Sequence, residues 1–330
     1  MRKINLGILA ASDIANHVAP TIKKIDCINL KAIASRTAEK AKAFALKHGI
    51  ERYYGSYEEL INDTDIDLIY ITTPHALHAK YMEMCINSGK AVICEKAFTI
   101  NAKEAERVFN LAKEKKVFVS EAIWQRYTPM AKILNDFISS GKLGKINHIT
   151  ANLGYAVWHR ERVHKNALGG GALLDVGIYT LNFADLVLNG ETPASISVNA
   201  QIDNEHKTDK CETVTLIYPS GVTATLYNSL INYTDRRGVI YGDKGYAVID
   251  NVNNFEALHF YSNADKGALT EEIIAPPMIS GYEYEFISAA TALLNGQIET
   301  PDCPHAQTLR LLRQTDAIRA QMRLTYPADK

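Results

Sequence analysis

The sequence predicts an α/β protein with two domains: a doubly wound parallel sheet first, then an α+β domain with a large, mostly antiparallel open sheet. Its 330 residues suffice for about two domains, each with its own core. Up to about residue 121, short apolar runs alternate with helix-period segments, as in strand–helix–strand units. After about residue 125, strand-like segments follow one another with turns between them, which is typical of an antiparallel sheet.

The apolar runs of the first region are expected to be parallel strands, because strands covered on both faces are apolar nearly throughout. They comprise residues 3–9, 28–35, 68–71, 91–94 and 117–120. One helix is expected to begin near Asp13, and Ser56 with Glu59 forms a capping box. Further helices are expected at residues 38–48, 76–87 and 101–116. This alternation predicts a ligand beyond the carboxyl ends of the strands.

The second region is rich in Val, Ile, Thr and Tyr, which favour strands. Its expected elements are a strand at 146–154, a glycine-rich turn, a helix at 172–188, strands at 194–202, 212–218, 223–230, 237–241, 246–249 and 257–261, and helices at 282–294 and 305–324. We see no internal repeat. We expect domains of residues 1–121 and 122–330, with the last helix able to pack back on the first domain.

Composition narrows the classes of partner. A formal net charge of -1 gives no surplus of positive charge for a nucleic acid backbone. The 5 cysteines are scattered without a C-x-x-C pair, so we expect reduced thiols and a cytoplasmic protein. Arg2 and Lys3 precede a short apolar run that resembles a signal peptide, but the run is better explained as the first strand, and no stretch is long enough to span a membrane.

The turn after the first strand lies where a dinucleotide-binding protein has the motif G-x-G-x-x-G/A. The three motif positions fall on Ala10, Ser12 and Ala15. Ala10 is tolerable if its φ stays negative, and the Ser12 hydroxyl could donate to a phosphate oxygen. Backbone N–H groups from Ala11 to Ile14 would still face a phosphate at the helix start. Taken alone, the stretch fits an ordinary strand-to-helix turn equally well.

The second strand ends in Ser35-Arg36, with no acidic residue before Glu39. An NAD-preferring site usually has an acid here for the ribose hydroxyls, whereas a hydroxyl and a guanidinium suit a 2'-phosphate. The alternative is a surface arginine at the start of a helix.

Two later segments could carry chemistry. Glu95-Lys96 directly follows a buried strand at the expected ligand edge. Glycines at 169–171 precede a helix on which Asp175 and Tyr179 stand at i and i+4, on one face. The alternative for this second segment is a capped helix with a core tyrosine.

These segments, with Thr72-Thr73-Pro74-His75, His78 and the run from Glu121 through Trp124 and Arg126 to Pro129, resemble the glucose-fructose oxidoreductase/inositol dehydrogenase (Gfo/Idh/MocA) family. Within it, the chain most resembles the branch of dimeric dihydrodiol dehydrogenases and NADP-dependent D-xylose dehydrogenases. The match covers nearly the whole chain. Ala97 stands where the family usually has proline, and His75 where it commonly has asparagine.

The resemblance implies a Rossmann fold and a nicotinamide cofactor, with NADP(H) preferred and NAD(H) possible. It implies Lys96 and Tyr179 as the catalytic pair, and Asp175 as a group that either orients the substrate or supports the catalytic residues without touching the substrate. A tyrosine accepts a hydroxyl proton only if its pKa is lowered from about 10, which a neighbouring ammonium achieves. The expected cofactor-binding residues are Ala10, Ala11, Ser12, Asp13, Ile14, Ser35, Arg36, Thr72, Thr73, Pro74, His75, His78, Glu95, Lys96, Trp124 and Arg126.

Substrate contacts are expected from Tyr155, Trp158, Arg162 and Asp175, although a structural ion pair is the better explanation for Arg162 and core positions fit the aromatic residues equally well. No carboxylate or cysteine completes a metal site around the histidines.

The expected function is hydride transfer between NADP(H) and a secondary hydroxyl or carbonyl of a sugar, polyol or cyclic diol, in a homodimer formed through the second sheet. The alternatives are a family enzyme that uses tightly bound NAD(H) for transient oxidation, as a glycosidase or epimerase, and a non-catalytic NADP(H)-binding sensor.

Overall fold

The computed structural model describes residues 2–329, and the chain forms two compact units. The first contains the residues up to Tyr127 together with Met278–Leu309. The second contains Thr128–Pro277 and the residues from Arg310 on. Each unit is built on one sheet, so each is described separately.

The first unit has a parallel sheet with the strand order β3-β2-β1-β4-β5-β6. Its strands are β1 (Ile4–Leu9), β2 (Ile28–Ala34), β3 (Arg52–Tyr54), β4 (Leu68–Ile71), β5 (Ala91–Glu95) and β6 (Val119–Ala122). The order reverses between β1 and β4, which is the point where a doubly wound sheet binds its ligand. The predicted parallel, doubly wound sheet is therefore confirmed.

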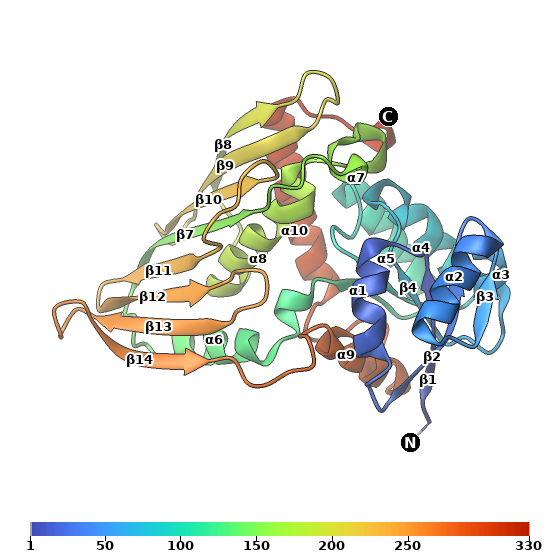
Figure 1. Ribbon diagram of the computed structural model, residues 1–330. Helices are drawn as coiled ribbons and strands as arrows, with labels where there is room; N and C mark the ends of the chain where they lie inside the picture. The colour runs from blue at the N-terminus through green and yellow to red at the C-terminus, as the bar shows by residue number, and fades with distance from the viewer. Residues whose placement is uncertain (1, 330) are drawn as a thin grey trace. The chain divides into compact units, whose positions relative to one another are not determined.

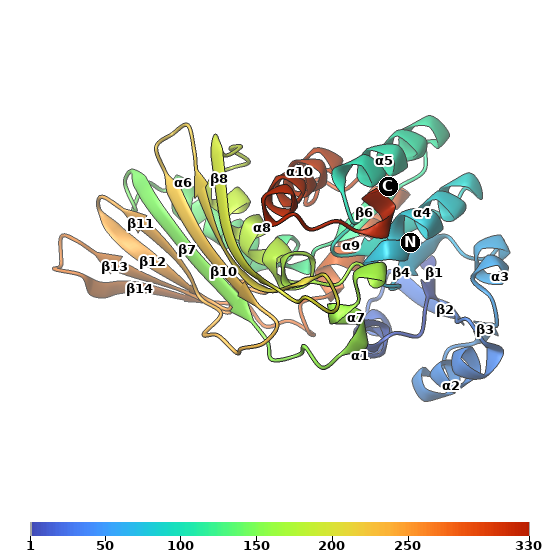
Figure 2. The same ribbon diagram turned by 90° about the horizontal axis from the view of Figure 1, so that it is seen from above.

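Helices cover both faces of this sheet, and Figure 2 shows α4 and α5 on one side of the strands with α1 and α2 on the other. The helices are α1 (Asp13–Ile22), α2 (Ala38–His48), α3 (Tyr57–Asn62), α4 (His78–Asn87), α5 (Ala102–Lys115) and, from the later segment, α9 (Glu283–Leu294). The capping box of Ser56 and Glu59 is present, and α2 ends at Gly49 in the left-handed conformation, as the sequence predicts.

Two details of the first sheet differ from the sequence prediction. The sixth strand begins at Val119, because Val117 instead closes the end of α5 by donating its N–H to Ala112 O at 2.9 Å. The edge strand β3 was not predicted. It has only three residues, which is too short for a period of two to show in the sequence.

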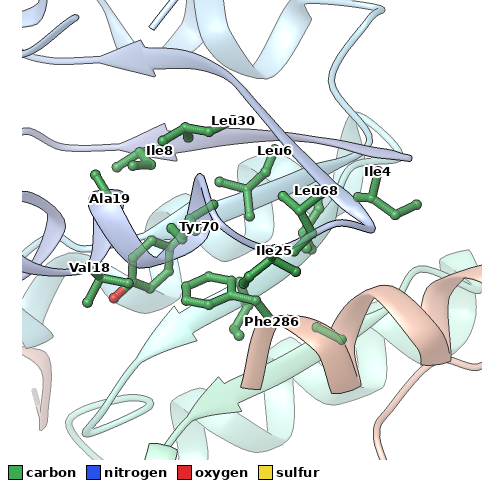
Figure 3. Close-up of a cluster of buried hydrophobic side chains, with 14 of the residues drawn as sticks. Ile4, Leu6, Ile8, Val18, Ala19, Ile25, Leu30, Leu68, Tyr70 and Phe286 are labelled. Atoms are coloured by element: carbon green, nitrogen blue, oxygen red, sulfur yellow. The ribbon is translucent and has the colours of Figure 1, made fainter. Parts of the chain in front are cut away.

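The core of the first unit includes residues that are far apart in the sequence. Figure 3 shows Phe286, from α9, facing Tyr70 of β4, and their rings meet edge to face with centroids 5.0 Å apart. Ile8 and Val18 belong to the same buried cluster. The helix α9 thus completes the hydrophobic core under the parallel sheet.

The second unit has a sheet of eight strands in the order β14-β13-β12-β11-β7-β10-β9-β8. They are β7 (Ile146–Gly154), β8 (Ser195–Ile202), β9 (Asp209–Ile217), β10 (Thr223–Ser229), β11 (Gly238–Gly242), β12 (Gly245–Asp250), β13 (Ala257–Ser262) and β14 (Ala268–Ile274). Only β7 and β10 run parallel, so the predicted open, mostly antiparallel sheet is confirmed. The edge strand β14 was not predicted.

Figure 1 shows α6 (Pro129–Ser139) and α8 (Ile178–Val187) behind the strands of this sheet. In β9, Val214 and Leu216 are buried while Thr213 and Thr215 are partly exposed, so the strands alternate between a covered and an open face. The remaining helices are α7 (Glu161–His164) and α10 (His305–Met322).

The predicted helix at 172–188 begins with a π-helical turn, η4 (Leu173–Gly177), before α8. A π-turn is wider than an α-turn, so Asp175 and Tyr179 do not stack as strictly as the predicted i, i+4 spacing implies. Among residues 2–329, no helix is both long and apolar enough to cross a membrane.

Candidate active site

The loops after β1, β2, β4, β5 and β6 lie at the carboxyl edge of the parallel sheet. They carry Ser12, Arg36, Thr73, Lys96 and Trp124 respectively. All five are among the residues expected to bind the cofactor, and the topology brings them to one edge because all six strands are parallel.

Ala10 corrects one expectation about the turn after β1, since its φ is +96° and not negative. The backbone holds the residue from both sides. Its N–H donates to Ala34 O at 3.1 Å, and its carbonyl accepts from the Thr72 hydroxyl at 2.8 Å. The turn therefore keeps a conformation that favours glycine, although the residue is alanine.

Ser12 is the N-cap of α1. Its hydroxyl oxygen accepts the N–H of Ala15 at 3.2 Å, so the hydroxyl hydrogen remains available to donate. The N–H groups of Asp13 and Ile14, in the first turn, have no partner within the helix by its geometry. These donors and the positive end of the helix dipole fit a pyrophosphate.

The end of β2 fits a further phosphate. Ser35 is 5% exposed, whereas Arg36 is exposed and no carboxylate among residues 2–329 forms an ion pair with it. Thr37 then caps α2 by accepting the N–H of Lys40 at 3.4 Å, so a second helix N-terminus begins beside the guanidinium. Both features favour a bound anion.

The loop after β4 also fits a ligand. The Thr73 hydroxyl is buried and has no hydrogen-bond partner within residues 2–329. A buried hydroxyl without a partner is costly unless a ligand satisfies it. With Ser12 and Arg36, it makes this edge suitable for a phosphorylated dinucleotide.

His75 and His78 contact the loop that carries Lys96. His75 Nε2 lies 3.1 Å from Lys96 O, while His78 Nδ1 lies 2.9 Å from Ala97 O and its Nε2 lies 2.7 Å from Thr73 O. Burial lowers the pKa of His78. His78 therefore links the loops after β4 and β5, and the Lys96–Ala97 peptide between these contacts is cis.

Buried acids lie next to the β5 end. Glu95 accepts a hydrogen bond from the Tyr70 hydroxyl. Glu121 accepts the Phe98 N–H at 3.1 Å and the Thr308 hydroxyl at 2.9 Å, and burial raises the pKa of Glu121 to about 7. Glu121 thus holds the backbone two residues beyond Lys96. No role for Glu121 is expected from the sequence, although an acid inside an apolar run is a signal of a buried carboxyl.

Trp124 follows β6 and is packed by the later segment. Its ring stacks on Tyr282 with centroids 4.2 Å apart and planes 6° apart. A side chain at Gly281, where φ is +94°, would come within 3.0 Å of the indole. Arg126 lies on the same short helix, η2 (Trp124–Arg126). The stacking fixes the indole at the sheet edge.

Asp175 and Tyr179 belong to the second unit and are 5% and 7% exposed. Arg162 NH1 lies 2.9 Å from Asp175 Oδ1, which is the structural ion pair favoured from the sequence. The arginine side chain is still 46% exposed, so it also remains accessible. Lys96 belongs to the first unit.

The two aromatic candidates for substrate binding both have cationic neighbours. The Arg236 guanidinium carbon lies 5.9 Å from the Tyr155 ring centroid, and Lys210 Nζ lies 5.5 Å from the Trp158 ring. Both aromatic side chains are partly exposed. They are therefore surface positions of the loop after β7 and not core residues.

A doubly wound parallel sheet with phosphate-binding features at its switch point defines a dinucleotide-binding protein. A family model described as an oxidoreductase family with an NAD-binding Rossmann fold matches residues 4–123, and the model of a GFO/IDH/MocA C-terminal domain matches residues 132–248. The chain belongs to the Gfo/Idh/MocA family of NAD(P)-binding oxidoreductases, as the sequence resemblance predicts.

Individual relatives agree with this. A trans-1,2-dihydrobenzene-1,2-diol dehydrogenase from Xenopus tropicalis is 31% identical over 329 residues, which are 97% of this chain and 98% of the relative. Aldose-aldose oxidoreductase from Caulobacter crescentus, at 24% identity, shares the fold with a TM-score of 0.87 over 98% of both chains. A 3-ketoreductase from Actinomadura kijaniata in complex with NADP also has 24% identity and a TM-score of 0.87, over 97% of this chain and 98% of that one.

Proposed function

We propose that this oxidoreductase transfers a hydride between NADP(H) and a secondary hydroxyl or carbonyl of a sugar, polyol or cyclic diol. The observation that carries the proposal is the edge of the parallel sheet, where Ser12, Arg36 and Thr73 offer donors without partners of their own to a phosphorylated dinucleotide. The 31% identity to a dihydrodiol dehydrogenase supports a cyclic diol or a related carbohydrate as the substrate.

The cofactor preference rests on the end of β2. Arg36 has no carboxylate partner in residues 2–329, and no acid precedes Glu39 to bind the ribose hydroxyls. A 2'-phosphate would be held by the Arg36 guanidinium, the Ser35 hydroxyl and the N-terminus of α2. We therefore expect NADP(H) to bind more tightly than NAD(H).

Bound NADP(H) would supply the hydride acceptor or donor. The chain's own part is to hold the substrate and move the hydroxyl proton. Tyr179 would take that proton as the alcohol is oxidised and return it to the carbonyl oxygen in reduction, while the Lys96 ammonium favours the phenolate. Asp175, fixed by Arg162 at 2.9 Å, would orient the substrate.

The proposal is tested with nicotinamide absorbance on a panel of aldoses and diols. We expect Tyr179→Phe and Lys96→Met to lower kcat/KM by at least about a hundredfold, since each removes proton transfer or its driving force. Tyr53→Phe and Lys103→Met, at exposed positions of the first unit, are the matched controls. Undiminished activity of the Tyr179 and Lys96 variants would refute the mechanism.

The same preparation separates the alternatives. Transient oxidation would be indicated if NAD(H) copurifies with the protein and a glycoside is cleaved or a sugar is epimerised. The nicotinamide absorbance would then show no net change. NADPH binding without turnover of any substrate in the panel would indicate a sensor.

We also propose that the protein is cytoplasmic and forms a homodimer through the open face of the eight-stranded sheet. The 5 cysteines are all unpaired, which suits a reducing compartment. The open face carries a row of aromatic side chains, with Tyr246 stacked on Tyr261 at 4.6 Å and Tyr241 40% exposed. Tyrosine side chains are enriched at protein interfaces.

A further inference from the structure

Two carboxyl groups are buried beneath the helical segment that carries Asp175 and Tyr179. Asp209, the first residue of β9, is 0% exposed, and Glu212, three residues on, is 1% exposed. They lie within hydrogen-bonding reach of each other. Among residues 2–329, no arginine, lysine or histidine forms an ion pair with either carboxyl.

Asp209 contacts the beginning of the π-helical turn. Its Oδ2 accepts the N–H of Leu173 at 2.6 Å, so it caps the turn from a neighbouring strand. Ala172 itself makes no side-chain cap. A carboxylate at this position interacts favourably with the N–H groups and dipole of the helix start. Asp209 is therefore the member of the pair that best bears the negative charge.

The backbone lies directly against the two carboxyls. A Cβ at Gly171 would be 2.1 Å from Asp209 Oδ1, and one at Gly177 would be 2.9 Å from Glu212 Oε1. The glycines thus allow the π-helical turn to pack on these oxygens, one at each end of the turn. A shift of either carboxyl would move the turn.

Strand β10 also connects Glu212 to the helical segment, through Asn228. Asn228 is paired with Glu212 across the strands, and its Oδ1 accepts the hydroxyl of Thr180 at 2.9 Å. Thr180 directly follows Tyr179, and its hydroxyl oxygen also lies 3.0 Å from Gly177 O, so its one hydrogen is shared between the two acceptors. The cluster of Asp209, Glu212 and Asn228 therefore touches the helical segment on both sides of Tyr179.

The hydrogen-bond requirement of this cluster indicates its protonation. If both acids were ionised, the Asn228 amide would be the one side-chain donor beside Glu212 within residues 2–329, and Asp209 Oδ1 would be buried without a donor. Two buried like charges would also repel each other. One proton on Glu212 removes the repulsion and lets the protonated carboxyl donate to Asp209, while the Asn228 amide is placed to donate to the other Glu212 oxygen. Burial and the Asp209 charge raise the pKa of Glu212 well above its usual range.

We propose that Asp209 and Glu212 share one proton, with Glu212 as the neutral donor, and that this pair positions the π-helical turn and Tyr179 for catalysis. The inference rests on the proposed role of Tyr179. Glu212 is a positioning residue in this scheme, since it acts through the turn and not on the substrate.

The pH dependence has a definite sign. A carboxyl whose pKa is raised by folding stabilises the folded state at low pH, and this contribution is lost as the pH rises through the folded-state pKa. Other titratable groups near the pair are Cys211 and Tyr326, with Arg319 over the Tyr326 ring and Asp175 on the turn itself. Substitutions at Glu212 separate its contribution to the pH dependence of stability from the contributions of these other groups.

The first experiment compares Glu212→Gln with Glu212→Leu in the full-length protein, using NADPH and the best substrate of the aldose and diol panel. The amide of glutamine can still donate to Asp209, whereas leucine cannot. We expect kcat of the glutamine variant to stay within about threefold of wild type. We expect the leucine variant to lose at least about tenfold in kcat, because small displacements of a catalytic group are costly.

The KM for NADPH should stay unchanged in both variants, because the proposed cofactor residues are in the first unit. Glu205→Gln, whose side chain is 84% exposed on the same hairpin, is the control. Wild-type kcat in the leucine variant, or equal losses with glutamine and leucine, would overturn the proposal.

The second experiment needs no activity. The free energy of unfolding of the wild-type and Glu205→Gln proteins should fall as the pH rises from about 4.5, the usual pKa of a glutamate, up to the raised pKa of Glu212 in the folded state. The Glu212→Gln protein should lack this component. Parallel curves for all three would overturn the shared proton. Full activity of the Tyr179→Phe protein would instead refute the proposed function. The unfolding experiment would then still test whether Asp209 and Glu212 share a proton. If the leucine variant fails to fold, the unfolding titration of the other proteins still tests the proposed shared proton.

Discussion

Glu121 shows how one buried residue connects the loop of Lys96 to the rest of the first unit. Its two carboxyl oxygens accept from Phe98, in the loop after β5, and from Thr308, in α10. Since burial raises its pKa to about 7, the folded state retains a proton that the unfolded chain releases near pH 4.5. Glu121 therefore makes the free energy of unfolding depend on pH between about 4.5 and about 7.

The sign and size of this effect can be tested. The folded state binds more protons between the two pKa values, so the free energy of unfolding should fall as pH rises from about 4.5 to about 7. The contribution of Glu121 should be about 3 kcal/mol. Denaturant titrations across this range should show a flatter curve for Glu121→Gln, while the exposed control Glu58→Gln should follow wild type. A Glu121→Gln curve parallel to wild type would contradict the prediction.

At the scale of elements, the turn between β1 and α1 is strained by one methyl group. A residue other than glycine at φ +96° costs about 1–3 kcal/mol, while glycine costs about 0.5–1 kcal/mol through the entropy of the unfolded chain. The free-energy cost of the strain exceeds the entropic cost of glycine, so Ala10→Gly is expected to raise the free energy of unfolding.

Thermal or denaturant unfolding should therefore show Ala10→Gly to be more stable than wild type, by about 1 kcal/mol. The neighbouring substitution Ala11→Gly is the control. Because Ala11 does not have a positive φ, it should lose stability by about 0.5 kcal/mol. Equal losses at both positions would mean that Ala10 is not strained.

Strand β9 shows what an element's pattern does and does not reveal. Glu212, Val214 and Leu216 alternate along the strand, so the sequence pattern already places Glu212 on the buried face. The pattern cannot show that Asp209 and Asn228 lie beside it, because those contacts depend on how β9, β10 and the π-helical turn pack together. A buried acid within an alternating strand is therefore a useful signal for such clusters.

At the scale of the whole molecule, the open face of the large sheet predicts the oligomeric state. Val239 lies on this face in β11, between Thr150 of β7 and Val248 of β12. A buried, unpaired carboxylate in an interface is strongly unfavourable. Val239→Glu should therefore convert a dimer to a monomer in sedimentation or light-scattering measurements.

The control for that experiment is Leu46→Glu, which changes an apolar residue that is 75% exposed on the first unit. This variant should leave the wild-type oligomeric state unchanged. A Val239→Glu protein that remains dimeric would place the interface elsewhere, and a monomeric wild type would refute the proposed dimer.

The sequence by itself determined the features that depend on neighbouring residues. Apolar periodicity located β1, β2, β4 and β5, and local capping residues located the starts and ends of helices, because both signals act within a few residues. The order of motifs from Ser12 to Tyr179 was sufficient to indicate the family.

Only the tertiary structure decided what depends on distant contacts. It brought α9 under the parallel sheet, added the short edge strands β3 and β14, imposed a positive φ on Ala10, and gave the buried acids Glu121 and Glu212 their neighbours. Strand pairing at an edge, the partners of a buried acid and strain in a turn are set by residues far away in the chain. Local sequence patterns contain no information about those partners, which is why these features required the folded structure.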